Sequence, residues 1–444
     1  MKRLGIFFLS MGLFFPLAAQ IPLKEAVKAG IQKSLDLKNQ RLSVEAQRFA
    51  AETADLQRRF TVDAGGSYRY QSQRMNIEIP VSEIGSNPNA SDLSLSVGTH
   101  HSYDFNVQAR QILFKGNILN NAVKAESIKI AVEQNAAALK KVEIAAAVKQ
   151  SYFTYRLLQS KYQTLQVMMN RLEFHHNRLK SLFAEDLVRK SDLLETRNGL
   201  DEMRLRMEEL NARMESERTR FRYLTGLDLA DVEDDYHEAD LTFERAADFF
   251  SSSHPVMLTL GDNLSLLDVR AQMIKGRGLP QIAAVTELHY GKPGIDFFQN
   301  RWSLYVVGGI QVSLPVFNWK KDSRELELLE INRRRLENER ADFLEEGTNQ
   351  LRRLFDDLES ADRKIKIIRS LVETAREDNR LKEELLQEKQ ISNLEYLASV
   401  TAEEEYLSRL NEIRVQRDII KLGIRSRIGW GVDGSSEETM GEKK

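Results

Sequence analysis

Cysteine is absent from the 444 residues of this chain. Its absence excludes disulfide bonds, a thiol nucleophile, and the lipid-modified N-terminal cysteine of a bacterial lipoprotein. The absence is compatible with an oxidising compartment, but it does not identify one. Any stability of the fold must therefore come from packing and hydrogen bonding rather than from covalent cross-links.

Proline and long apolar runs are also scarce. The chain has 8 prolines and 29% charged residues, a profile typical of long helices with few breaks. Beyond the N-terminus no stretch approaches the roughly 20 apolar residues that a membrane-spanning helix requires. Lys and Arg (64) nearly balance Asp and Glu (66), so neither the net charge nor a basic run indicates a nucleic-acid partner. If the chain meets a membrane, it does so through strands.

The first 19 residues have the pattern of a secretory signal peptide. Lys2 and Arg3 precede the apolar run 4–17, and the small residues Ala18 and Ala19 follow it. This order of charged, apolar and small residues is typical of a segment that is removed after export. We expect residues 1–19 to be a signal peptide and the mature chain to start near Gln20.

The rest of the sequence repeats itself at a spacing of 203 residues. Three separated landmarks recur at this spacing: Phe114 with Phe317, Asp192 with Glu395, and Gly226 with Gly429. Between them, apolar residues step by threes and fours in both halves, as in a coiled-coil seam. Two long heptad helices can always be aligned with one another, but agreement of the separate landmarks favours a duplication. We predict repeats at 20–228 and 229–432, followed by a disordered tail at 433–444.

Each repeat has the same order of elements. The expected order is a helix of about 35 residues, a strand pair and a very long helical stretch, at 22–59, 61–114 and 117–224 and again at 245–278, 280–317 and 320–428. Weak interruptions of the long stretches fall at 186–190 and 389–393. Before each interruption the helix would be roughly 100 Å long, which fits a bundle or a tube and not a compact globule. Upstream of the strands the spacing is 219, because the helix end before Thr61 matches the one before Pro280. The first repeat is therefore longer between Thr61 and Phe114, where the Ser-, Asn- and Gly-rich segment 80–99 predicts a longer loop.

The predicted strands alternate between apolar and polar residues. Apolar residues at 103, 105, 107 and 109 alternate with Asp104, Asn106, Gln108 and Arg110, and residues 301–314 repeat the pattern. A soluble sheet with one buried face would show the same alternation. The isolation of each hairpin among helices favours a transmembrane barrel around a wet lumen, because a lone hairpin is marginal in water. Four strands cannot close a barrel and lipid does not tolerate an open edge, so such a chain would have to oligomerise.

A signal peptide, two repeats of helix, hairpin and interrupted long helix, the LFKG turn at 113–116 and the LTG at 224–226 together resemble the TolC family of outer-membrane efflux proteins. The resemblance implies a mainly α fold with a small transmembrane β part, in which a homotrimer forms a 12-stranded β-barrel and an α-helical tunnel. It implies a passive duct in the outer membrane that extends into the periplasm of a Gram-negative bacterium. Such ducts serve efflux or type I secretion of small molecules or proteins with a periplasmic adaptor and an inner-membrane pump, without catalysis, cofactor or metal.

In this family the gate lies at the periplasmic tip, where the long helices turn back. The family motif has glycine at each turn, and this sequence has Asp186 and Lys389 instead. Exposed residues at the two turns are the expected adaptor contacts: Val188, Arg189, Ile391, Ser392 and Asn393. A plain connection between helices would also be short and polar.

Family members often carry two carboxylates, three positions apart, just after the second turn. Glu395 matches the first of these, Ala398 stands at the second, and Asp192 and Glu195 keep both acids in the first repeat. Three symmetry-related copies around a pore would form a constriction that favours cations. The same acids would also be favourable at a helix start through the helix dipole, so both interpretations stay open.

Two other classes of protein remain as alternatives. A periplasmic coiled-coil adaptor or structural protein would have one helical hairpin flanked by soluble β-domains, whereas here the hairpin is doubled and strands are few. An enzyme lacks support because there is no phosphate-binding glycine loop and no serine elbow. The adjacent pairs His100-His101 and His175-His176 chelate a metal poorly, since neighbours on a helix point about 100° apart.

Overall fold

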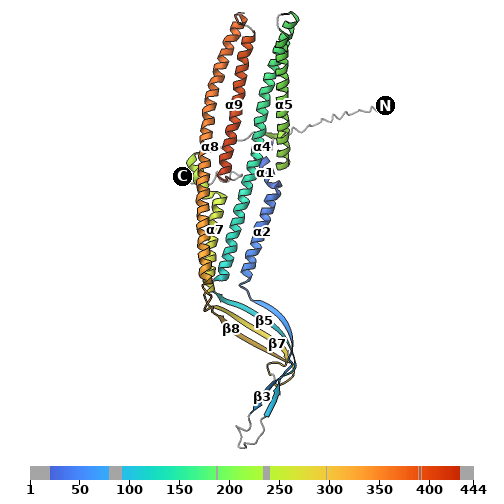
Figure 1. Ribbon diagram of the computed structural model, residues 1–444, viewed down its shortest axis with the longest axis vertical. Helices are drawn as coiled ribbons and strands as arrows, with labels where there is room; N and C mark the ends of the chain where they lie inside the picture. Colours follow the sequence, from blue (N-terminus) through green and yellow to red (C-terminus); the bar gives the residue numbers. More distant parts are fainter. Residues whose placement is uncertain are drawn as a thin grey trace, which may run out of the picture. The chain divides into compact units, whose positions relative to one another are not determined.

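The computed structural model describes residues 21–79, 93–186, 189–233, 241–296, 298–388, 390–391 and 393–430. The predicted signal peptide and the predicted tail lie outside the described residues. The described part is mainly helical with a small sheet part (Figure 1). This confirms the predicted mainly α fold with a small β part.

Two pairs of long helices dominate the chain. The first pair is α4 (Ile118–Ala184) and α5 (Lys190–Thr225), and the second is α8 (Lys321–Gln387) and α9 (Asn393–Arg427). Helix α8 begins at Lys321, 203 residues after α4 begins at Ile118. Helix α9 begins at Asn393, 203 residues after α5 begins at Lys190. The duplicated order of helix, hairpin and long helix is therefore confirmed.

Backbone conformation repeats at the same spacing. The turns into α4 and α8 are left-handed at Gly116-Asn117 (φ 56° and 59°) and at Trp319-Lys320 (φ 54° and 60°). Gly226 and Gly429 are left-handed too and end α5 and α9, the usual place for glycine after a helix. The two halves therefore share main-chain geometry even where their side chains differ.

The helix that precedes each sheet segment is broken once. One helix was expected at 22–59 and one at 245–278, but the structure has α1 (Leu23–Lys33), α2 (Leu35–Leu56), α6 (Phe243–Ser253) and α7 (Pro255–Arg277). Ser34 Oγ accepts a hydrogen bond from the Leu37 N–H at 3.2 Å, and His254 Nδ1 accepts one from the Val256 N–H at 3.1 Å. Pro255 also excludes helical geometry at the residue before it and is favoured at the first position of a helix.

The strands of both repeats form one antiparallel sheet. It contains β2 (Thr61–Tyr70), β5 (His101–Lys115), β7 (Gln281–Lys292) and β8 (Ser303–Ser313), in the order β2-β5-β7-β8. Its register places Gly66 opposite Phe105, Phe105 opposite Tyr290, and Tyr290 opposite Leu304. The four strands predicted from the two repeats are thus hydrogen-bonded to each other through β5 and β7.

The segment expected as a loop at 80–99 is not wholly a loop. Residues 80–92 lie outside the described residues, but Leu93–Val97 forms β4, which pairs antiparallel with β3 (Met75–Ile79). The alternation of Leu93, Leu95 and Val97 with serines is short, and the Ser and Asn content of the segment hides it. Two short strands, β1 (Ile21–Pro22) and β6 (Val232–Glu233), pair in parallel near the 3-10 turn η1 (Leu229–Asp231).

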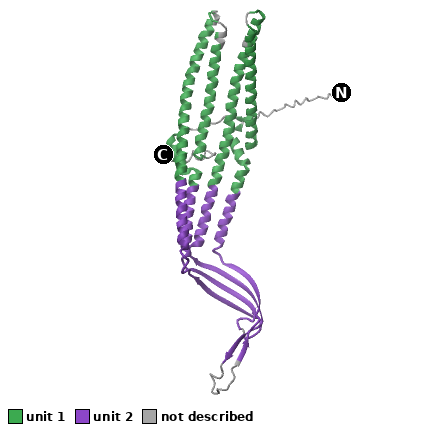
Figure 2. Cartoon of the chain, viewed as in Figure 1, with its two compact units in different colours: residues 1–41, 135–258, 340–444 green, residues 42–134, 259–339 purple. Residues whose placement is uncertain are grey.

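The chain divides into two compact units, which Figure 2 colours separately. Unit 1 comprises residues 1–41, 135–258 and 340–444, and unit 2 comprises residues 42–134 and 259–339. Each unit takes segments from both halves of the sequence, so the units do not coincide with the predicted repeats. The repeat limits 20–228 and 229–432 therefore stay a prediction about ancestry and do not describe separate domains.

Each unit has its own apolar core. In unit 1 one cluster joins α1, α4 and α5 around Tyr152, Phe153 and Phe221, and another joins α6, α8 and α9 around Phe250 and Leu351. In unit 2 a smaller cluster forms around Ala125, Leu266 and Val269. The predicted apolar steps of the two long helices contribute Val148 to the first cluster and Leu351 to the second. Ser151 of α4 is buried as well and donates a hydrogen bond to Glu217 Oε2 of α5 at 2.7 Å.

Candidate functional site

The chain turns back at two helix ends in unit 1, which are the predicted tips. Helix α4 ends at Ala184 and α5 begins at Lys190, while α8 ends at Gln387 and α9 begins at Asn393. Asp186 is left-handed (φ 58°), and its N–H bonds to the Phe183 carbonyl at 3.1 Å. Aspartate is one of the few side chains that tolerate this conformation, which explains how the turn forms without the glycine of the family motif.

The described part of the tips locates some of the predicted site residues. Glu395 lies exposed in the first turn of α9, with Ala398 exposed in the following turn, and Glu195 is exposed in α5. Arg189 is exposed directly before α5, and Ile391 is half-buried. Val188 and Ser392 lie outside the described residues, and so do the side chains of Asp192 and Asn393. The roles predicted for these residues in a pore constriction and in adaptor binding stay predictions.

Polar contacts hold each helix pair together behind its turn. Between α8 and α9, Glu403 accepts hydrogen bonds from Arg376 Nε at 3.0 Å and from Asn379 Nδ2 at 2.6 Å. Between α4 and α5, Arg204 pairs with Glu173 at 3.3 Å, and the His176 ring lies 2.8 Å from the Thr196 hydroxyl. Periodicity cannot predict such pairs, because it fixes which face a residue occupies and not which residue it meets.

A second set of contacts joins the two pairs to each other, between α4 and α9. Lys161 pairs with Glu412 at 3.0 Å, and Arg171 pairs with Glu404. The Thr164 and Ser408 hydroxyl groups also bond to each other. The Arg171 side chain is 13% exposed. Solvent and salt therefore screen this ion pair less than the surface pairs along the same helices. The first and second repeats are thus linked by side chains of α4 and α9 that hydrophobic periodicity alone does not identify.

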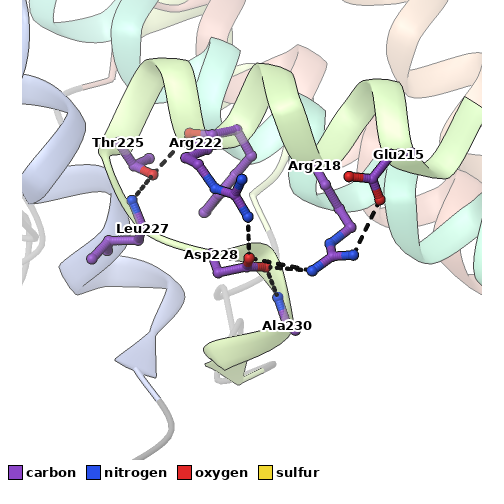
Figure 3. Close-up of polar contacts among 8 residues, drawn as sticks. Glu215, Arg218, Arg222, Thr225, Leu227, Asp228 and Ala230 are labelled. Atoms are coloured by element: carbon purple, nitrogen blue, oxygen red, sulfur yellow. Dashed lines mark hydrogen bonds and ion pairs between the residues drawn. The ribbon is translucent and has the colours of Figure 1, made fainter.

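The end of α5 is fixed by a compact charged corner (Figure 3). Asp228 caps η1 by accepting a hydrogen bond from the Ala230 N–H at 3.1 Å, and it also bonds both Arg218 and Arg222. The backbone hydrogen bond, followed by the bonds from the two guanidinium groups, lowers the pKa of Asp228 to about 2. This corner directly follows the LTG segment. Asp228 therefore connects the end of α5 to the start of η1.

One face of the sheet in unit 2 is polar. The His289 ring lies between two carboxylates, with Nδ1 3.0 Å from Asp104 and Nε2 3.0 Å from Glu287. Gln108 donates to the other oxygen of Glu287 at 2.9 Å, and the His289 ring stacks on Tyr305 with centroids 4.9 Å apart. Asp104 and Gln108 were on the predicted polar face, but Glu287 and His289 were missed. Their alternation along β7 was the available signal.

The opposite face of this sheet is apolar and exposed. Leu304 is 67% exposed and Ile310 70% exposed, and Phe105, Val107 and Val306 share this exposed face. Aromatic side chains gather toward one end of it, where Trp302 packs with Tyr290 at 4.9 Å and with Tyr103 at 5.9 Å between ring centroids. Beyond the other end of β8, Trp319 is 85% exposed and contacts Phe317. An apolar band with aromatic residues at both ends results.

No described helix combines the length and the apolar composition needed to cross a membrane. The described His, Asp and Glu side chains also form no group of three or more placed to hold a metal ion.

Comparison with known proteins identifies the fold. No model of a protein family matches the sequence, and no curated protein is similar to it in sequence. Solved structures do match. CusC, described as forming a transmembrane channel, shares 13% identity over 92% of each chain with a TM-score of 0.70.

Two further solved structures match over nearly their whole length. The outer membrane protein VceC of Vibrio cholerae shares 12% identity over 93% of this chain and 97% of its own, with a TM-score of 0.70. The CmeC outer membrane channel of Campylobacter jejuni shares 13% identity over 95% of this chain and 88% of its own, with a TM-score of 0.68. The chain therefore has the fold of these outer-membrane proteins, as its resemblance to the TolC family implies.

Proposed function

We propose that this chain is the outer-membrane channel subunit of a tripartite efflux or type I secretion system. In this proposal a homotrimer forms a passive duct across the outer membrane and the periplasm. The observation that carries the proposal is the four-stranded sheet of unit 2, which has an apolar exposed face, a polar face and two open edges. The shared fold with CusC, VceC and CmeC supports the same function.

In a membrane, the open edges of the sheet would have to pair with strands of other copies of this chain. Within the described residues, β2 and β8 each hydrogen-bond to a single neighbour, so one edge of each strand is unpaired. In a lipid environment unpaired backbone groups cost several kcal/mol each, which only a closed barrel avoids. Joining β2 of one copy to β8 of the next closes the barrel. Three copies would give the 12 strands implied by the family resemblance.

The dimensions and the surface of the sheet fit a membrane. Its strands are 10, 15, 12 and 11 residues long, and a tilted transmembrane strand needs about 9–11 residues. Barrels of outer membranes carry an apolar band flanked by aromatic girdles. The cluster around Trp302 and the pair Phe317-Trp319 occupy the two ends where such girdles would lie. The polar face with Asp104, Glu287 and His289 would then line a wet lumen.

The helix tips are the proposed contact with the other components. A periplasmic adaptor would bind at Val188, Arg189, Ile391, Ser392 and Asn393, and an inner-membrane pump would supply the energy. The chain itself is proposed to carry out no catalysis and to need no cofactor. Carboxylates at Glu395, Asp192 and Glu195 would form the constriction, with the acids of the two tips unequal because Ala398 replaces the second acid of α9.

Extraction and assembly test this function. We expect the chain to fractionate with the outer membrane, to need detergent for release, and to run as a trimer in light scattering. Ile310→Lys places a charge on the apolar face of β8, where the cost in lipid is about 2–4 kcal/mol, so it should reduce the amount of trimer in the membrane strongly.

Gln311→Lys is the matched control, because residue 311 is the next along β8 and belongs to the other face of the strand. It should leave the yield of trimer nearly unchanged. A soluble monomer in the periplasmic fraction would contradict the channel function and favour the adaptor. Equal effects of the two lysines would show that the apolar face does not contact lipid.

A further inference from the structure

A cavity of about 590 Å³ in unit 1 is lined by two cationic side chains. Its walls come from α4, α5, α8 and α9 and from the break between α6 and α7. Apolar side chains such as Phe343, Leu354 and Leu422 form much of its lining, and its charged residues are Arg220 and Arg427. No carboxylate is among the described residues that line it. The charged groups of the lining are therefore both cations.

Arg427 is held in place by aromatic rings. Its guanidinium carbon lies 5.5 Å from the ring centroid of Phe250 and 5.5 Å from that of Phe343. Such contacts attract a cation to the ring face but leave its hydrogen-bond donors unused. The Nε atom of Arg427 is buried and has no hydrogen-bond partner among the described residues. The two rings therefore fix the Arg427 guanidinium, while its Nε–H still lacks a hydrogen-bond acceptor among the described residues.

The two cations of the cavity differ in their ion pairing. Arg220 approaches Glu217 at 3.7 Å, the outer range of an ion pair, and its side chain is 51% exposed. Arg427 forms no ion pair with any described carboxylate. The positive charge of Arg427 also contributes, after burial, to a lowered pKa of His254. The charge of Arg427 thus remains without a paired carboxylate among the described residues, in a site that is largely apolar.

We propose that this cavity binds an organic anion whose acidic group pairs with Arg427 and Arg220 and whose apolar body packs on Phe343, Leu354 and Leu422. The volume lies within the range of about 300–1,000 Å³ that is typical of small-molecule sites. A carboxylate, sulfonate or phosphate can accept two hydrogen bonds from one guanidinium, which gives both affinity and orientation. The site is separate from the predicted constriction, and its existence does not depend on the proposed channel function.

Calorimetric titration of the full chain in detergent with 1-naphthoate tests the site. The neutral isostere 1-naphthamide is titrated in parallel, because it partitions into micelles and apolar surfaces without needing a cation. We expect saturable binding of naphthoate and at least tenfold weaker binding of naphthamide. Arg427→Gln should weaken the binding of naphthoate at least tenfold, since it removes the charge and keeps most of the side-chain length.

Arg425→Gln is the matched control. Arg425 lies two residues away on α9, also contacts an aromatic ring, that of Trp430, and is not part of this cavity's lining. It should change the affinity for naphthoate less than twofold. Arg220→Gln offers a second variant outside the aromatic contacts if Arg427→Gln fails to fold, and it should weaken binding about threefold or more.

Three results would overturn the proposal. The first is the absence of saturable naphthoate binding by the unmodified chain. The second is equal affinity for naphthoate and naphthamide, which would indicate apolar partition only. The third is an Arg427→Gln or Arg220→Gln protein that keeps its melting temperature and its full affinity for naphthoate.

Discussion

At the scale of single residues, the structure uses non-glycine side chains where glycine would be easiest. Asn117, Asp186, Trp319 and Lys320 all have positive φ angles between 54° and 60°. For residues other than Gly, Asn and Asp this conformation costs roughly 1–2 kcal/mol. Asn and Asp suit it, but Trp319 and Lys320 do not. The turn into α8 is therefore held by the helix and sheet that it connects rather than by local preference.

His254 predicts a dependence of stability on pH. Burial and then the charge of Arg427 lower its pKa from 6.5 to about 4, and the side chain is 5% exposed. Between these two values the unfolded chain binds more protons than the folded chain, so this contribution to stability is lost as pH falls from about 6.5 to about 4. Protonation would also remove the acceptor that caps Val256.

His254→Asn separates this effect from the general response to acid. Asparagine can keep the cap but does not titrate. Between pH 7 and pH 4.5 the free energy of unfolding should fall more for the unmodified chain than for the variant. The difference should be on the order of 2 kcal/mol after allowance for screening. The melting temperatures of both proteins in detergent measure this difference. Parallel pH profiles would contradict the assignment to His254.

Glu395 predicts the ion preference of the proposed constriction. We expect Glu395→Gln to lower the cation-to-anion permeability ratio by about twofold or more in planar bilayers, because three symmetry-related charges are removed at once. Ala398→Glu should raise the ratio by adding the acid that this tip lacks. Glu208→Gln, on an exposed part of α5, serves as the control. If the ratio stays constant in all three variants, Glu395 acts only through the helix dipole.

Some residue-level features lie beyond sequence reasoning in principle. The contact of His289 with Asp104 joins residues 185 positions apart, and it depends on the register between β5 and β7. Alternation fixes the face on which each side chain lies, but a register is set only when strands pair. The pairing of Arg171 with Glu404 depends in the same way on how two helices pack. In contrast, the exposed position of Glu395 at a helix start was predictable from its place after the turn.

At the scale of elements, periodicity predicted the long helices well and the short breaks poorly. The long helices carry an apolar seam over many turns, so their limits follow from the loss of that seam. The breaks at Ser34 and His254 each involve one residue and do not shift the seam enough to be noticed. His254-Pro255 nevertheless carried a local signal, because the residue before proline avoids the helical region. The β3-β4 hairpin was missed because its strands are only five residues long.

The close approach of two glycines in unit 2 gives a prediction for helix packing. A Cβ atom on Gly276 would lie 2.2 Å from the Gly116 carbonyl oxygen, and one on Gly116 would lie 2.1 Å from that of Gly276. Gly276→Ala must therefore push α7 away from the turn before α4. We expect the free energy of unfolding to fall by about 2 kcal/mol or more, a value in the middle or upper part of the range typical of overpacking.

Gly261→Ala, in the same helix, is the matched control. A Cβ atom there meets nothing within 4 Å, and alanine is favoured over glycine inside a helix by about 1 kcal/mol. This variant should melt at the same or a higher temperature, whereas Gly276→Ala should melt at a lower one. Tolerance of alanine at both positions would show that the backbones of Gly116 and Gly276 are not in close contact.

At the scale of the whole molecule, the duplication was the most informative property of the sequence. It predicted two hairpins and two long helical returns, and the equivalent helices indeed begin 203 residues apart. It could not predict that the strands of both repeats form one sheet, because β5 and β7 belong to different repeats. The compact units likewise combine segments of both repeats, since packing follows spatial neighbours and not ancestry.

In the part of the chain that the structure describes, the sheet has two open edges, which matter before the proposed trimer assembles. Strands β2 and β8 each offer a row of backbone donors and acceptors beside an apolar face, which is the arrangement most prone to edge-to-edge aggregation. In the proposed trimer the same edges close the barrel. On this proposal, an unassembled copy would be prone to aggregate until it meets two others. Its production should therefore depend on periplasmic chaperones, and surplus copies should be removed by proteolysis.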